Sequence, residues 1–231
     1  MRQFLSLMIL LSCLLSCKTK TENVVATKSF QLLIPDTTNN RRAQVDLRII
    51  QHCSQIAKQL GFKDLQKGVD SFEVRAWYDF SFSNYEELYI LKLLDTSYSV
   101  SYFRFYCRSY DYDNENRNRQ WNAYTQPIID SCISKTVLLQ KDDLKDFSFQ
   151  EVWNLHSQSE LKIPDSIGFT DCYTHTIEVA DKRRYKFMSH HCSEPYFDKL
   201  KIKDINNFIE YFREVGGIAY KHNVRVPNVY D

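Results

Sequence analysis

Three strand-like segments follow one another in the first half of the chain, and no helical segment separates them. They span residues 71–78, 87–94 and 100–107. The first and third alternate apolar with polar residues at the two-residue period of a half-buried strand, and the second is a more continuously apolar run. Successive strands without regular β–α–β alternation are typical of antiparallel sheets with helices gathered to one side, so the pattern predicts an α+β fold.

Helical segments lie before and after this block of strands. Apolar residues recur at the helical period over residues 43–60, and Gly61 follows the last of them. Ser148 and Glu151 have the spacing of a capping box and predict a short helix. A final helix is predicted over residues 204–217, with an Asp cap at its start, an apolar stripe, and two glycines at its end.

Further strands complete the predicted sheet, which has about six antiparallel strands covered by two or three helices. These strands span residues 133–139, 173–179 and 184–191. Residues 17–40 are polar and mostly lack a period, which predicts a tether. No linker rich in Pro, Gly or Ser interrupts residues 41–231, so we expect them to form a single α+β domain.

The first seventeen residues have the pattern of an export signal. A positive start precedes an apolar run over residues 4–15, which is about the length of a signal-peptide core and too short to span a bilayer. The run ends in Leu14-Leu15-Ser16-Cys17, which resembles the lipobox of bacterial lipoproteins. The resemblance implies that residues 1–16 are removed as a signal peptide and that Cys17 becomes the lipidated first residue.

A second motif, Leu10-Leu11-Ser12-Cys13, competes with the first. Cleavage at Cys13 would leave two leucines exposed, so Cys17 is favoured; cleavage without lipidation and an uncleaved N-terminus are the alternatives. A lipid on Cys17 implies a protein anchored to a membrane of the cell envelope. Lys18 follows the cysteine where Asp would signal retention in the inner membrane, so the resemblance favours the outer membrane of a Gram-negative bacterium.

The sequence favours one pairing register for the hairpin predicted over residues 173–191. If residues 181–183 form a three-residue loop, the numbers of paired positions sum to 364. Val179 then lies opposite Tyr185, and apolar residues pair with one another. A two-residue loop with a sum of 363 would mix the two faces, so the register with a sum of 364 is predicted.

This register sets Cys172 directly across from Cys192, close to the separation that a disulfide requires. An exported location permits oxidation, so a disulfide between these two residues is expected. Cys107 and Cys132 are candidates for a second disulfide across the intervening loop, although no register argument supports that pair. Cys53 lies on the apolar stripe of the first helix and is expected to be a buried, reduced cysteine.

Five potential metal ligands lie between residues 172 and 192, namely His175, His190, His191, Cys172 and Cys192. Their spacing matches no zinc motif, and the predicted register puts His175 and His191 on one face of the hairpin and His190 on the other. We therefore expect no metal, and we expect these histidines to be partly exposed strand residues.

Glycine and charge exclude several classes of function. The five glycines have spacings that permit no dinucleotide-binding, P-loop or nucleophile-elbow motif, so no cofactor and no catalytic residue are expected from motifs. Thirty Lys and Arg residues against 29 Asp and Glu residues give a net charge of +1. That balance lacks the basic field of a nucleic-acid binder.

The polar segment over residues 110–126 contains Trp121 and Tyr124. Exposed Tyr and Trp side chains are common at protein interfaces and sugar-binding faces, so these two residues are candidates for contact with an envelope protein or a glycan. The composition is similar to that of uncharacterised envelope lipoproteins of Gram-negative bacteria. We expect a binding module; the alternatives are an extracytoplasmic hydrolase, which would need a pocket joining His175 or His191 to a carboxylate, and an immunity or inhibitor lipoprotein.

Overall fold

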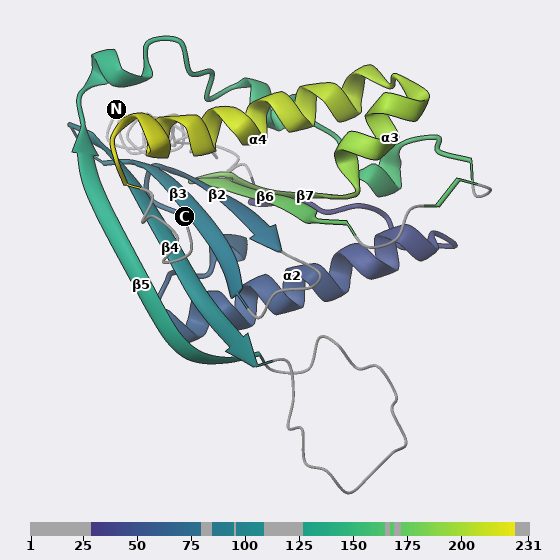
Figure 1. The fold of residues 1–231 in the computed structure, drawn as a ribbon, viewed down its shortest axis with the longest axis horizontal. Helices are drawn as coiled ribbons and strands as arrows, with labels where there is room; N and C mark the ends of the chain where they lie inside the picture. The colour runs from purple at the N-terminus through teal and green to yellow at the C-terminus, as the bar shows by residue number, and fades with distance from the viewer. Residues whose placement is uncertain are drawn as a thin grey trace, which may run out of the picture.

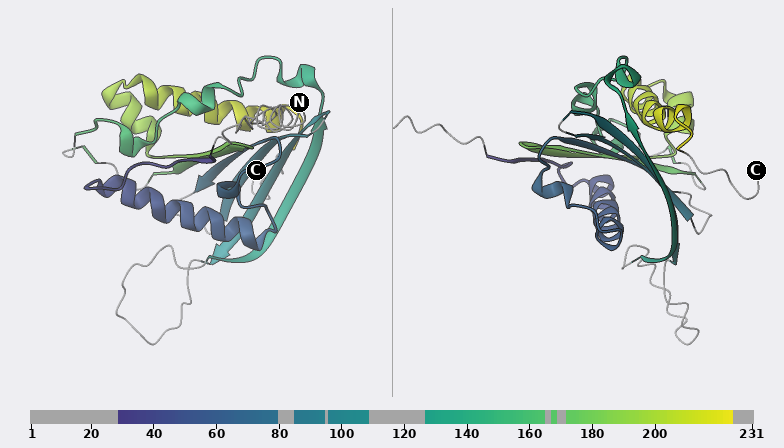
Figure 2. Two further views of the ribbon diagram at one scale, coloured as in Figure 1. Left: turned by 180° about the vertical axis from the view of Figure 1, so that it is seen from behind. Right: turned by 90° about the vertical axis from the view of Figure 1, so that its left-hand side faces the viewer.

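A seven-stranded sheet lies between two layers of helix in the computed structural model (Figure 1). Helix α2 (Arg41–Gln59) covers one face, and helices α3 (Ser193–Leu200) and α4 (Lys203–Lys221) lie over the other (Figure 2). The α+β class is therefore as predicted. The structure describes residues 29–79, 85–94, 96–108, 127–164, 167–168 and 172–224.

The sheet is mixed, which corrects the antiparallel sheet of about six strands. Its order is β1-β7-β6-β2-β3-β4-β5, and β1 runs parallel to β7 whereas every other pair is antiparallel. The strands are β1 (Gln31–Leu33), β2 (Phe72–Asp79), β3 (Tyr85–Leu93), β4 (Tyr98–Arg108), β5 (Ile128–Leu139), β6 (Thr174–Asp181) and β7 (Arg184–His191).

The additional strand β1 comes from the segment 17–40 that was expected to be a tether throughout. Three residues are too few to reveal a strand period, so the sequence pattern did not indicate it. The Gln31 N–H donates to the Arg183 carbonyl at 2.8 Å and holds the segment against the edge of β7. The folded domain therefore begins before residue 41.

Helix α2 forms where the sequence predicts it. Asn40 caps its start, because the Asn40 side chain accepts a hydrogen bond from the Ala43 N–H at 3.1 Å. Its apolar stripe, which includes the buried Cys53 and Ile56, packs on Trp77 and neighbouring apolar residues of the sheet. Burial of Cys53 agrees with its predicted structural role.

Helix α4 packs its apolar stripe on the opposite face of the sheet. Phe208, Phe212 and Val215 are buried against residues from the central strands. The helix continues through residues 216–217 to Lys221, so the prediction that the two glycines end it is wrong. Ala219 extends the buried stripe by another turn, and this packing outweighs the roughly 1 kcal/mol by which each interior glycine weakens a helix.

The β6–β7 hairpin has a register one residue away from the predicted one. Val179 lies opposite Lys186 and Ala180 opposite Tyr185, so paired numbers sum to 365. The Asp181 carboxylate accepts hydrogen bonds from the Arg183 and Arg184 N–H groups at 2.7 and 2.9 Å and closes a two-residue turn. The alternation argument failed because helices cover both faces of this hairpin, so polar and apolar residues do not separate cleanly between faces.

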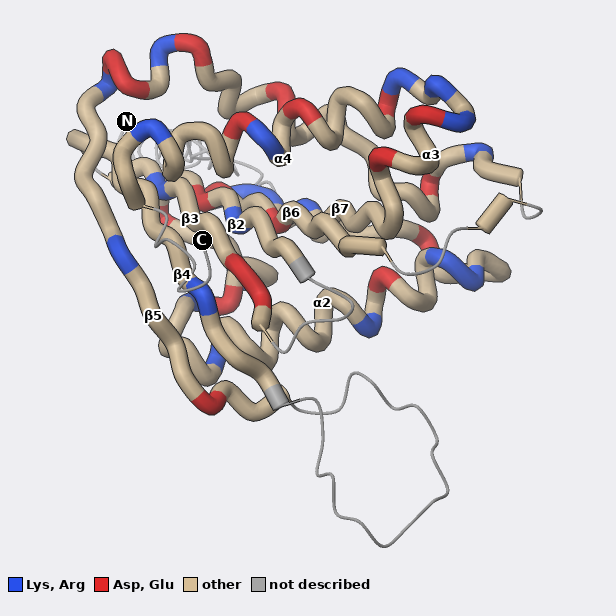
Figure 3. The backbone as a smooth tube through the Cα atoms, viewed as in Figure 1, with Lys and Arg blue, Asp and Glu red and all other residues tan. Residues whose placement is uncertain are grey.

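Short segments complete the domain. The helix predicted after Ser148 is a single 3₁₀ turn, η3 (Glu151–Asn154), whose Glu151 N–H donates to the Ser148 hydroxyl at 3.3 Å. Acidic and basic residues are mixed along α4, whereas α2 carries Arg41, Arg42, Arg48 and Lys58 and has Asp46 as its one acidic residue (Figure 3). None of the helices in the described ranges is both long enough and apolar enough to cross a bilayer.

Candidate functional site

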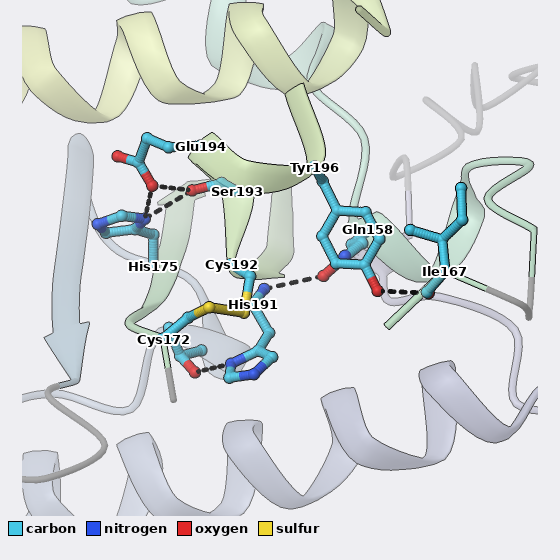
Figure 4. The surroundings of a disulfide bond; sticks show 10 residues. Gln158, Ile167, Cys172, His175, His191, Cys192, Ser193, Glu194 and Tyr196 are labelled. Carbon is cyan, nitrogen blue, oxygen red and sulfur yellow. Dashed lines mark hydrogen bonds and ion pairs between the residues drawn. A yellow bond between two sulfur atoms is a disulfide. The ribbon is translucent and has the colours of Figure 1, made fainter. Parts of the chain in front are cut away.

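A disulfide joins Cys172 to Cys192 at the end of the β6–β7 hairpin, with a Cα–Cα distance of 5.0 Å (Figure 4). The pairing was predicted, but its geometry differs from the prediction. In the observed register Cys172 lies beyond the paired residues, and Cys192 adopts a left-handed conformation with φ of 55°. This turn lets the Cys192 N–H donate to the Tyr173 carbonyl at 3.0 Å and brings the two sulfur atoms together.

Removing the disulfide gives a testable stability effect. The bond closes a loop of 20 residues, so the chain-entropy model predicts that Cys172→Ser/Cys192→Ser loses roughly 3 kcal/mol of unfolding free energy. Urea denaturation of the variant and of the oxidised wild type measures the difference. A Cys132→Ser variant is the control, because Cys132 is exposed and outside this loop; equal loss in both variants would contradict a specific role for the disulfide.

Next to the disulfide, His175 and the first residues of α3 form a polar cluster (Figure 4). The His175 Nδ1 atom lies 2.8 Å from the Ser193 hydroxyl, and the Ser193 hydroxyl donates to the Glu194 carboxylate at 3.0 Å. His175 Nδ1 therefore carries the proton that it donates to Ser193. Burial lowers the pKa of His175 to about 4, and the Glu194 carboxylate only partly opposes that shift.

The cluster lacks the geometry of a serine hydrolase. In a Ser–His–acid triad the serine and the acid engage opposite nitrogens of the ring, so that a proton can pass between them. Here Ser193 and Glu194 both face Nδ1, at 2.8 and 3.9 Å, and the Ser193 hydroxyl is buried. This arrangement anchors the start of α3 to β6, and it favours a structural role over the hydrolase alternative.

His190 is a second buried histidine, directly opposite His175 in the hairpin. The two side chains share one face, which corrects the prediction that His175 shares a face with His191. The His190 Nε2–H donates to the His156 carbonyl at 2.9 Å, and the ring stacks on Phe208 with centroids 4.1 Å apart. Burial lowers the pKa of His190 to about 4, so the ring is neutral at neutral pH.

Because His190 is buried and neutral in the folded chain, we expect it to make the free energy of unfolding depend on pH. The unfolded chain binds a proton at His190 near pH 6.5, whereas the folded chain binds it near pH 4, so the His190 contribution falls by about 1.4 kcal/mol per pH unit between these values. Asp46 acts in the opposite direction, because burial raises its pKa to about 6. The wild type therefore has to be compared with a variant.

The variant is His190→Phe, which keeps an aromatic ring against Phe208. Denaturation curves from pH 7 to pH 4 should show the wild type losing stability relative to His190→Phe as the pH falls. A stability difference that stays constant with pH would contradict the buried, neutral histidine.

The five candidate metal ligands of this region do not converge. Cys172 and Cys192 are consumed by the disulfide, and the His191 Nδ1 atom lies 3.1 Å from the Thr174 hydroxyl on the opposite face from His175. In the part of the chain that the structure describes, no group of three or more His, Cys, Asp or Glu side chains could hold a metal ion.

The other candidate residues have mixed outcomes. Cys107 lies opposite Ile129 and Cys132 opposite Phe105, and no disulfide joins the two described cysteines, so the suggested second disulfide is not formed. Register explains this result, because the two residues are not paired. Trp121 and Tyr124 lie in residues 109–126, and Cys17 in residues 1–28, outside the described residues.

An exposed aromatic and aliphatic surface lies beside the ends of residues 109–126. We call Tyr85, Tyr106, Ile128 and Ile133 the β3–β5 patch. Tyr106 pairs with Tyr85 across β3 and β4, and their ring centroids are 6.0 Å apart. Tyr106, Ile128 and Ile133 are exposed although they belong to paired strands of the sheet. The aromatic richness of these strands was visible in the sequence, but the selection of exposed residues depends on where α4 stops covering the sheet.

Next to this patch, on the same face of the sheet, lies a buried ion pair between Glu87 on β3 and Arg104 on β4. Arg104 Nη2 lies 2.7 Å from Glu87 Oε1, and the Tyr102 hydroxyl donates to the same oxygen at 2.7 Å. The Arg104 guanidinium also lies over the Tyr85 ring, 5.3 Å from its centroid. The pair links β3 to β4 beside the patch, and sequence alternation alone gave no signal for it.

A comparison of this chain with protein-family models, with curated proteins and with solved structures gives no match.

Proposed function

We propose that this chain is an exported lipoprotein, anchored in the cell envelope through Cys17, whose domain binds a protein or glycan partner. The observation that carries the proposal is the Leu14-Leu15-Ser16-Cys17 motif at the end of a signal-like apolar run. The disulfide at Cys172 supports it, because structural disulfides persist in oxidising compartments outside the cytosol. Lys18 supports the outer membrane of a Gram-negative bacterium as the location.

The binding role is supported by the β3–β5 patch. Tyr and Ile side chains on a hydrogen-bonded sheet give contact area at low entropic cost, and the Arg104 guanidinium packs over the Tyr85 ring. The strands that carry the patch lead directly into residues 109–126, which contain Trp121 and Tyr124.

Metabolic labelling tests the anchor. Cells that express the wild-type protein and are grown with labelled palmitate should incorporate the label into it, and Cys17→Ala should abolish incorporation. Cys13→Ala is the matched control, because it removes the competing motif and should leave labelling intact. Label that persists in Cys17→Ala and disappears in Cys13→Ala would place the lipid at the wrong residue for this proposal.

Affinity capture with the lipidated protein tests the binding surface. We expect a partner recovered with the wild type to be lost with Trp121→Ala/Tyr124→Ala and retained with Tyr220→Ala. Tyr220 is an aromatic control, 72% exposed at the far end of α4. Equal recovery with all three proteins, or recovery with none, would reject the proposed contact.

A further inference from the structure

The outer edge of the sheet at β1 exposes apolar side chains on both of its faces. Phe30, Leu32 and Leu33 are all exposed, and Leu32 reaches 53%. Successive strand residues point to opposite faces, so exposure of both Leu32 and Leu33 shows that neither helix layer extends over this edge. The rest of the sheet up to β3 is covered on both faces (Figure 2).

Packing fixes this edge in place. The Phe30 ring occupies the space next to Gly68, where an added Cβ would lie 2.7 Å from the ring, and Gly68 has φ of +79°. The Gln31 N–H bonds to Arg183, and the Leu32 backbone pairs with Tyr185. The apolar side chains therefore belong to a formed strand.

Positive charge lies beside these side chains. Lys182 and Arg183 form the exposed β6–β7 turn, and the Arg183 carbonyl is bonded to β1. The nearby Asp181 carboxylate is already engaged by the Arg184 guanidinium at 3.1 Å. Apolar residues flanked by cations are typical of surfaces that contact anionic lipid.

The position of the anchor points to the same surface. Cys17 and Phe30 are 13 positions apart, so the chain between them can reach at most about 45 Å. A domain of this size is roughly 40 Å across. The anchor therefore limits the distance between the lipid and the β1 edge more tightly than the distance to the opposite edge at β5.

We propose that the β1 edge, meaning Phe30, Leu32 and Leu33 with Lys182 and Arg183, rests on the phospholipid surface that holds the Cys17 lipid. This inference rests on the proposed function. The apolar side chains reach the boundary between the headgroups and the acyl chains, and the two cations lie beside anionic phosphates. Because β1 and β5 are opposite edges of one sheet, this orientation turns the β3–β5 patch away from the membrane and toward a partner.

Photolabelling from within the bilayer tests the orientation. The purified lipidated protein is placed in vesicles of phosphatidylethanolamine and phosphatidylglycerol with a photoreactive acyl-chain probe, and labelled residues are located by mass spectrometry. Residues 30–33 should carry roughly tenfold or more label than Leu138 or Tyr220, because the probe is confined to the bilayer. Leu138 and Tyr220 are 66% and 72% exposed, so labelling governed by exposure alone would reverse this order.

Variants separate the contribution of the apolar side chains from that of the two cations. Leu32→Glu/Leu33→Glu should lose label at residues 30–33 while its melting temperature stays close to that of the wild type, and Leu138→Glu should leave that label unchanged. Lys182→Glu/Arg183→Glu should reduce the label only in vesicles that contain phosphatidylglycerol. Label that is equal in the Leu32→Glu/Leu33→Glu variant and the wild type would overturn the proposed contact.

The two proposals fail in different ways. Protein that does not float with the vesicles and carries no lipid at Cys17 would overturn the proposed function, and the inference with it. Lipidated protein that floats but is labelled at Leu138 or Tyr220, or nowhere in the domain, would overturn only the β1-edge orientation.

Discussion

An Arg104→Met variant should lose about 3 to 5 kcal/mol of unfolding free energy. The substitution removes the buried cation that lies 2.7 Å from the Glu87 carboxylate, and a charged carboxylate that stays buried without the opposite charge is strongly destabilising. Met retains much of the volume of the aliphatic part of the side chain, so the loss reports on charge more than on packing. Chemical denaturation with far-UV circular dichroism measures it.

The control is the double variant Arg104→Met/Glu87→Gln. A neutral amide at position 87 can still accept the hydrogen bond that the Tyr102 hydroxyl donates, so the double variant should recover most of the lost stability. A single variant as stable as the wild type, or a double variant no more stable than the single, would show that this pair is not the electrostatic link between β3 and β4.

A Phe208→Ala variant should lose a similar amount, about 3 to 5 kcal/mol, because a fully buried ring leaves a cavity when it is truncated. Phe208 is the ring of α4 that stacks on His190, with centroids 4.1 Å apart. The loss should appear as a lower urea concentration at the midpoint of unfolding.

Tyr220→Ala is the matched control on the same helix. Tyr220 is mostly exposed, so its truncation should change stability by less than about 0.5 kcal/mol. Similar losses at the two positions would mean that α4 does not cover the sheet through its apolar stripe.

The sequence predicted those elements whose periodicity extends over many residues. Helix α2 and strands β2, β3, β4, β6 and β7 lie close to where their apolar patterns place them, whereas β5 begins at Ile128, five residues before its predicted start. Strand β1 was missed because three residues carry no period and because its pairing with β7 joins distant parts of the chain. The extension of α4 past Gly216 was missed because packing of Ala219 outweighs local propensity.

The hairpin shows why a correct contact can follow from an incorrect register. The sequence argument paired Cys172 with Cys192 by assuming a three-residue loop, whereas Asp181 closes a two-residue turn. The disulfide forms nevertheless, because Cys192 leaves the strand in a left-handed conformation. The faces of His175 and His190 depended on the register alone, so that part of the prediction was wrong.

The candidate site was less predictable than the fold. Exposure of Tyr106 and Ile133 depends on where the covering helix ends. The Glu87–Arg104 pair depends on the register between β3 and β4. Neither the end of the helix nor the register can be obtained from local sequence. The expectations for Cys17, Trp121 and Tyr124 stay predictions, because these residues lie outside the described ranges.

Mass spectrometry of the N-terminal peptide of the protein purified from cell membranes tests the lipid anchor most directly. The account predicts a peptide that begins at Cys17 and carries acyl chains, with no residue from 1–16 attached. A peptide that begins elsewhere, or an unmodified Cys17, would contradict the anchor and the envelope function built on it.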